Sequence, residues 1–159
     1  MNFPLVSDSF DWASFATSVL NTDNLGCDFQ ERLHLEWTVR GHRIRQSFAN
    51  DGKLIAFLRR GLPPYYGSNL VLYRGENLGR LRDGIIGLSW TTSEATARIF
   101  GRGLNTIHEG GVLLKTVASS EAIIAGPSQH SLYLNESEFT VEPALLSKVE
   151  TIDRFDPIN

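Results

Sequence analysis

Two glutamates near the end of the chain are the residues whose type and spacing most clearly indicate chemistry. Glu136 and Glu138 lie in the alternating segment 136–141, with the sequence ESEFTV. In a strand, Phe139 and Val141 would face the core, and both carboxylates would leave on the other face with Cα atoms about 6.6 Å apart. Like charges on one face repel, so the pattern indicates either a charged edge strand or a working pair. Such a pair can stabilise a developing cation and deprotonate a nucleophile.

An arginine followed by a glycine is the second feature. Arg74 and Gly75 come directly after the apolar residues of segment 70–73. An arginine at a strand end can bind a phosphate group through two parallel hydrogen bonds, and a neighbouring glycine lets a ligand approach the backbone. An exposed arginine in a turn explains the same two residues without a ligand. The pair therefore indicates an anion site only in combination with other residues.

Two hydroxyl residues on either side of a tryptophan form the third feature. Alternation along Ser89-Trp90-Thr91 puts the two hydroxyls on one face of a strand and the indole on the other. The hydroxyls could orient a ligand or a catalytic carboxylate. In the alternative interpretation, Thr91 or Ser93 caps the following helix and Trp90 belongs to the core.

The elements that must position these residues are predicted by hydrophobic periodicity. Helical spacing is present over 10–21, from Asp28 onward with a break near Gly41, and from about Asp51 to Gly61. We expect one further helix after the capping pattern at 91–94, and strands over 70–73, 85–91, 111–117, 122–125, 136–141 and 145–152. The fold class is therefore predicted to be α+β, as one domain over 1–159, with a helical lobe at 1–62 ahead of a β-rich core at 66–159.

Composition excludes several classes of function. The 159 residues carry a net charge of −3, the only cysteine is Cys27, and the four histidines are scattered, so we expect no disulfide and no metal site. Apolar runs are too short to cross a membrane and the first residues do not resemble an export signal, which predicts a cytoplasmic protein. Segment 28–62 has a net charge of +3 and segment 101–159 a net charge of −4. The basic segment is interpreted either as solvated helix faces or as a surface for an acidic partner.

Taken in this order, the three features resemble the arginine-serine-glutamate class of ADP-ribosyltransferases. The resemblance covers roughly residues 66–146 and depends on the ordered set Tyr73-Arg74-Gly75, Ser89-Trp90-Thr91 with its following helix, and Glu136-Ser137-Glu138. It implies a split antiparallel β core with a helical layer packed on it. It also implies NAD as co-substrate and no metal.

The resemblance assigns a role to each matching residue. Arg74 is similar to the arginine that binds the phosphates of NAD, and Gly75 to the backbone contact for nicotinamide. Ser89 corresponds to the serine that holds the catalytic glutamate, which is Glu138. Glu136 is similar to the upstream glutamate that engages the acceptor. Trp90 and Thr91 depart from the usual threonine and serine, although Thr91 keeps a hydroxyl.

Two loops complete the expected site. Segment 126–135 precedes the glutamates and corresponds to the loop that recognises the target, with His130 and Tyr133 as candidate contacts. Segment 101–111 corresponds to the loop that covers NAD. Its glycines predict a mobile lid, and Arg102 is a candidate phosphate contact.

The expected activity is transfer of ADP-ribose to a macromolecule. Cleavage of the nicotinamide–ribose bond develops an oxocarbenium-like cation, which Glu138 would stabilise while Glu136 orients or deprotonates the acceptor. Protein and RNA acceptors are both open. The resemblance further suggests a bacterial or phage toxin, held by a neutralising antitoxin protein in a toxin-antitoxin or phage-defence system. The alternatives are an NAD glycohydrolase with water as acceptor, and a non-catalytic binding protein with the same fold.

Overall fold

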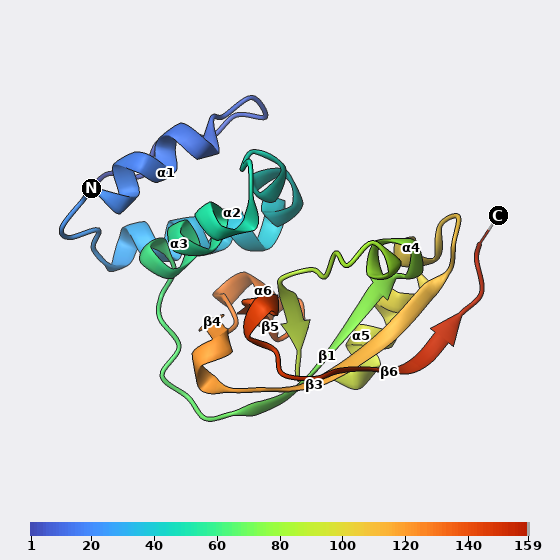
Figure 1. Ribbon diagram of the computed structural model, residues 1–159. Helices are drawn as coiled ribbons and strands as arrows, with labels where there is room; N and C mark the ends of the chain where they lie inside the picture. The colour runs from blue at the N-terminus through green and yellow to red at the C-terminus, as the bar shows by residue number, and fades with distance from the viewer. Residues whose placement is uncertain (159) are drawn as a thin grey trace. The chain divides into compact units, whose positions relative to one another are not determined.

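The chain forms two compact units, and it passes from one to the other three times. The computed structural model describes residues 1–158, without the side chain of Leu104. The first unit comprises Met1–Pro64 and the short segment Ser128–His130; the second comprises Tyr65–Pro127 and the chain from Ser131 onward. Figure 1 traces both units from the blue N-terminus to the red C-terminus. The first unit ends two residues after the predicted limit of the helical lobe.

The first unit contains three helices at the predicted places. They are α1 (Trp12–Leu20), α2 (Cys27–Gln46) and α3 (Asp51–Gly61). Asp11 and Asn50 cap α1 and α3 by accepting hydrogen bonds from backbone amides of the first turn, which satisfies donors that a helix start leaves unpaired. The predicted break near Gly41 is a kink within α2, where Arg40 leaves helical geometry.

Apolar faces of these helices form a core rich in aromatic residues. Trp12, Phe29 and Phe57 are each at most 3% exposed. Phe15 lies among them, with its ring centroid 6.2 Å from that of Trp12 and 6.0 Å from that of Phe29. The amphipathic spacing read from the sequence is therefore the packing pattern of this unit.

The second unit is built on one antiparallel sheet of six strands in the order β4-β5-β2-β1-β3-β6. The strands are β1 (Leu70–Asn77), β2 (Ser89–Thr91), β3 (Gly111–Ala118), β4 (Ile123–Ala125), β5 (Glu138–Val141) and β6 (Val149–Phe155). This confirms the predicted α+β class and the antiparallel sheet. Strand β2 is shorter than β1 and pairs with it at Tyr73 and Thr91.

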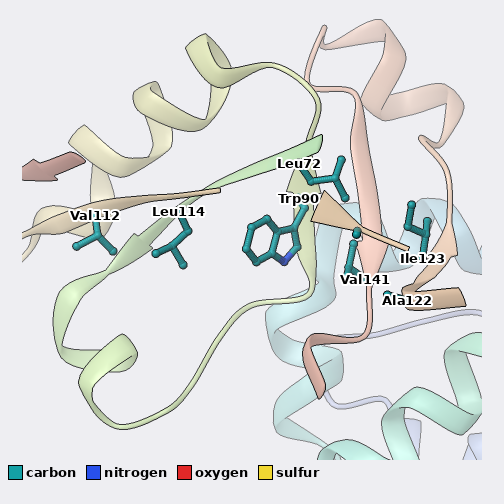
Figure 2. Close-up of a cluster of buried hydrophobic side chains, with 8 residues drawn as sticks. Leu72, Trp90, Val112, Leu114, Ala122, Ile123 and Val141 are labelled. Atoms are coloured by element: carbon teal, nitrogen blue, oxygen red, sulfur yellow. The ribbon is translucent and has the colours of Figure 1, made fainter. Parts of the chain in front are cut away.

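Buried side chains of the sheet hold its central strands together. Leu72, Trp90 and Leu114 are each at most 1% exposed and belong to one cluster with Val112 and Val141. Figure 2 shows the indole of Trp90 between Leu114 and Leu72. Trp90 is therefore a core residue, as one of the two sequence interpretations held.

Helix α5 (Glu94–Arg102) covers the end of β1 that carries the candidate residues. Ser93 is its N-cap and accepts a hydrogen bond from the Thr96 amide at 3.1 Å. This is one of the two caps, Thr91 or Ser93, that the sequence offered for this helix. Two short helices, α4 (Leu78–Arg82) and α6 (Gln129–Tyr133), were not predicted. Three 3-10 turns complete the secondary structure: η1 (Leu104–Thr106), η2 (Ser120–Ala122) and η3 (Pro143–Leu145).

Three strand predictions differ from the structure at their starts. β2 begins at Ser89 rather than Ile85, and β6 begins at Val149 because η3 occupies the residues after Pro143. β5 begins at Glu138, so Glu136 is not in a strand. Asn135 and Ser137 have φ values of 55° and 46°, which extended backbone does not adopt. Two-residue alternation therefore does not extend to Glu136.

The described residues contain neither a membrane-spanning helix nor a grouped set of metal ligands. Among the residues that the structure describes, no helix has the length and apolar character needed to cross a membrane. Within the same residues, no three His, Cys, Asp or Glu side chains are grouped so that they could hold a metal ion.

Candidate active site

Strands β2 and β5 bring a serine and a glutamate into direct contact. Thr91 pairs with Glu138 across the two strands, and Ser89 pairs with Thr140 two positions further along. The side chains of Ser89, Thr91 and Glu138 therefore share one face. The Ser89 hydroxyl donates a hydrogen bond of 2.9 Å to Glu138 Oε1. Two motifs that lie 49 residues apart in the sequence thus meet at one carboxylate.

The Glu138 carboxyl group holds its proton more tightly than an ordinary glutamate. Burial disfavours its charged form, and the charge of nearby Glu136 adds to this effect, while the Ser89 hydroxyl and the Arg74 charge act in the opposite direction. Together they raise the pKa of Glu138 to about 7. The group therefore changes charge near neutral pH, which is common for carboxylates that do chemistry.

Arg74 lies beside this pair and contacts β2. Its Nη1 donates a hydrogen bond of 2.6 Å to the Ser89 carbonyl, and its Nε donates one of 2.8 Å to Glu76. The Arg74 side chain is 17% exposed. An arginine has five N–H donors, so groups on Nη1 and Nη2 remain for an anion. The guanidinium is therefore fixed in place and still partly accessible.

Glu76 is a functional candidate that sequence reasoning missed. Its side chain is 1% exposed and accepts hydrogen bonds from Arg74 Nε, the Gly87 amide at 2.9 Å and the Asn77 amide at 3.0 Å. Burial by itself would raise the pKa of Glu76, but the Arg74 charge and these hydrogen bonds outweigh it and hold the pKa below its usual value. The available signal was its position two residues after Arg74, on the same strand face.

Gly87 provides the surface on which the Arg74 side chain lies. A Cβ atom at position 87 would overlap the guanidinium of Arg74. The Gly87 amide also donates to Glu76, and its carbonyl accepts a hydrogen bond of 3.0 Å from the Trp90 indole. One backbone position therefore connects the ion pair to the core of the sheet.

Gly75 lies where helix α5 packs closely on β1. A Cβ atom there would overlap the backbone nitrogen of Gly101 in α5, and the Gly75 carbonyl accepts a hydrogen bond of 3.1 Å from Asn105. The glycine is thus required because α5 packs closely on β1, and the space expected for a ligand on that side is occupied by the helix. Contact between the Gly75 backbone and nicotinamide stays a prediction.

The turn before β5 is fixed by two hydroxyl residues. Thr91 Oγ1 donates a hydrogen bond of 2.7 Å to the Glu136 carbonyl. Ser131 accepts from the Glu136 amide through its carbonyl at 3.0 Å and from the Glu138 amide through its hydroxyl at 2.7 Å. The prediction that both glutamates leave one strand face is wrong, because Ser137 is left-handed. Glu136 nevertheless lies close enough to Glu138 to raise its pKa.

The three other predicted site residues lie on helices rather than on the strands that carry Arg74, Ser89 and Glu138. His130 and Tyr133 are on α6, where His130 is partly buried and Tyr133 is 82% exposed. The Arg102 guanidinium lies over the Phe155 ring at 5.1 Å from its centroid, at the β6 edge of the sheet. Arg102 is the last residue of α5, and its side chain contacts β6. Binding of NAD by Arg102 stays a prediction.

The expected lid segment is tied to the rest of the second unit. Asn77 donates hydrogen bonds to the carbonyls of Asn105 and Ile107, and Thr106 is 1% exposed. A backbone bridge also joins Ile107 to Ile158. The segment comprises the end of α5, η1 and the turn after it, and its role as a mobile lid over NAD stays a prediction.

Three arginines of the basic segment 28–62 are paired with carboxylates of the first unit. Its arginines form ion pairs within that unit, Arg40 with Glu36, Arg43 with Asp8, and Arg45 with Asp51. Glu36 and Asp51 are already counted in the net charge of +3, whereas Asp8 lies outside segment 28–62, so its pair with Arg43 offsets one further positive charge. A cavity of about 540 Å³ is also present in this unit, lined by residues 1–5, 25–29 and Arg32, and contains none of the predicted site residues.

Comparison with known proteins gives no family for this chain, because no family model, curated protein or solved structure matches it.

Proposed function

We propose that this protein is a mono-ADP-ribosyltransferase with an ADP-ribosyltransferase-type fold, which cleaves NAD and transfers ADP-ribose to a macromolecular acceptor. The observation that carries the proposal is the hydrogen bond between Ser89 and Glu138, with Arg74 bonded to the Ser89 carbonyl. An arginine, a serine and a glutamate from three separate motifs thereby form one connected group. Both hydrogen bonds link residues that are far apart in the sequence and that folding brings together.

The residues of this group suit NAD by their chemistry. The remaining N–H groups of Arg74 can hold a phosphate, and the partly buried Glu138 carboxylate can lie against a ribose. Pairing with Glu76 keeps the guanidinium oriented before a ligand arrives. A glycosidase also uses two carboxylates, but it has no need for a phosphate-binding arginine beside them.

The reaction would proceed with Glu138 in its ionised form. The bond between ribose C1′ and the nicotinamide nitrogen breaks, the electron pair leaves with nicotinamide, and positive charge develops on the ribose. Glu138 stabilises that charge more in the transition state than in the ground state. The acceptor then bonds to C1′ and releases its proton, with Glu136 as the base.

The acceptor is proposed only as a class. Protein and RNA are both retained, and Tyr133 is exposed on α6 shortly before Glu136, where it could contact either. The further proposal of an intracellular toxin held by a neutralising protein depends on the resemblance alone.

Transfer of labelled ADP-ribose tests the function directly. NAD labelled in its adenylate part is incubated with the purified protein and with separated cell protein, RNA and DNA. We expect label in protein or RNA, and loss of label with Glu138→Gln or Arg74→Ala. Glu150→Gln makes the same chemical change on exposed β6 and should keep full transfer. Consumption of NAD without label would favour a glycohydrolase, and intact NAD in all fractions would exclude both enzymes.

A further inference from the structure

We propose that Ser131 is a positioning residue that fixes Glu136 and Glu138 relative to each other, an inference that rests on the proposed function. Ser131 lies in α6 and is fully buried. Its carbonyl accepts from the Glu136 amide at 3.0 Å and its hydroxyl accepts from the Glu138 amide at 2.7 Å. One residue therefore holds the backbone of both glutamates.

The hydroxyl of Ser131 acts where the sheet provides no partner strand. Strand β4 ends at Ala125, which pairs with Thr140, so β4 does not reach the first residue of β5. Glu138 pairs with Thr91 of β2 on its other side. Ser131 thus supplies the acceptor that a longer β4 would have supplied, and it orients the start of β5.

The turn between the two glutamates needs such external support. Asn135 and Ser137, on either side of Glu136, both have left-handed backbone conformations, which cost free energy for residues other than glycine. Conformations of this kind persist only where surrounding contacts determine them. The two bonds to Ser131 and the bond from Thr91 to the Glu136 carbonyl are those contacts.

Placement of the carboxylates matters because chemical steps are sensitive to small displacements. A shift of about 1 Å in a catalytic group can lower a rate about 100-fold. Ser131 itself is fully buried and lies behind the turn, so its removal changes where the carboxylates lie rather than what NAD contacts.

Ser131→Ala removes the hydroxyl acceptor and leaves the carbonyl acceptor in place. We expect kcat for NAD cleavage to fall about 10- to 100-fold, with less than about a threefold change in KM for NAD. The pH at half-maximal kcat/KM should also fall, because a looser turn lets water reach Glu138. An unchanged kcat and an unchanged pH profile in the folded variant would overturn the proposal.

The matched control is Thr116→Val on β3. Thr116 is also buried, and its hydroxyl donates to the Lys148 carbonyl at the β6 side of the sheet. Its loss should lower stability without changing the kcat or the pH profile. If Thr116→Val and Ser131→Ala lower activity only in proportion to the unfolded fraction, Ser131 is merely structural.

Two further measurements keep the inference separate from the proposed function. In the wild-type protein, the Glu136 and Glu138 amides should exchange with solvent as slowly as sheet amides, and rapid exchange would contradict the bonding to Ser131 even if the variant does not fold. An NMR titration of the Glu138 carboxyl in Ser131→Ala follows its placement without NAD. A wild-type protein that leaves NAD intact would sink the proposed function, whereas a normal Glu138 titration in Ser131→Ala would sink only the role of Ser131.

Discussion

Glu76 and Glu138 are two largely buried glutamates of one sheet whose pKa values move in opposite directions. Glu76 accepts hydrogen bonds from Arg74 and two backbone amides, and its pKa lies below the usual value. Glu138 accepts a hydrogen bond from the Ser89 hydroxyl, and its pKa is raised to about 7. Arg74 acts on both groups. Burial raises the pKa of both groups, so the donors and charges around each carboxylate decide which one stays charged.

This difference separates a structural carboxylate from a chemically available one. Charges that are fully hydrogen bonded hold other groups in place, as Glu76 holds Arg74. A carboxylate with few donors keeps unused capacity, which an approaching positive charge can use. The same substitution at the two positions should therefore have opposite consequences.

The largest effect is expected for Glu138→Gln. NAD cleavage should fall about 1000-fold, because the neutral amide cannot stabilise a developing cation. The free energy of unfolding at pH 8 should remain equal or rise, since the folded protein no longer has to hold a poorly paired charge. Steady-state kinetics and urea unfolding measure the two quantities. A variant that is inactive and also strongly destabilised would show that Glu138, like Glu76, has a structural role.

Glu76→Gln should show the reverse pattern. Removing the charge leaves Arg74 unpaired, and the free energy of unfolding should fall by about 3 to 5 kcal/mol. Urea unfolding at pH 7 measures this loss, with Glu150→Gln on exposed β6 as the control that should stay near wild type. A Glu76→Gln protein as stable as wild type would show that this ion pair contributes little.

Gly87→Ala tests the contact that holds Arg74 from the other side. The added methyl group overlaps the guanidinium, so the side chain must move away from Glu76 and Ser89. We expect kcat/KM for NAD to fall about tenfold, with a loss of about 1 to 2 kcal/mol in stability. Gly84→Ala is unsuitable as a control because its φ is positive, whereas Gly41→Ala in α2 adds the same methyl group at an ordinary contact distance from Trp37. Normal kinetics in Gly87→Ala would argue against a role for the Arg74 position.

A smaller effect is expected in the pH dependence of the free energy of unfolding. Glu138 loses its proton near pH 7 in the folded protein and near 4.5 in the unfolded chain, so its ionisation lowers stability as pH rises between these values. The stability advantage of Glu138→Gln should be absent at pH 4 and complete at pH 8. For Glu76 the sign is opposite, because its stabilising contribution is lost as pH falls below 4.5.

Glu136→Gln tests whether a neighbouring negative charge contributes to the raised pKa of Glu138. It removes a negative neighbour, so the pKa of Glu138 should fall below its value of about 7. An NMR titration of Glu138 measures this shift without any substrate. An unchanged midpoint would mean that burial alone sets the pKa.

Regular elements were predictable from the sequence, whereas the details of the site were only partly so. Helical spacing predicts α1 and α3, and the capping pattern predicts the start of α5, because both signals are local. The left-handed turn carries only a weak signal, since Asn135 is of a type that often adopts this conformation but Ser137 is not. The role of Glu76 was also hidden, because a buried ion pair and a solvated charge look alike in a sequence.

Trp90 gives the site a natural optical reporter. It is buried between the two hydroxyl residues of β2, and its indole bonds to Gly87, on which the Arg74 side chain lies. The other tryptophans, Trp12 and Trp37, belong to the first unit and can be replaced by phenylalanine. In that background the fluorescence of a single indole would respond to changes around Arg74 and Ser89, so binding to the second unit becomes visible without an attached dye.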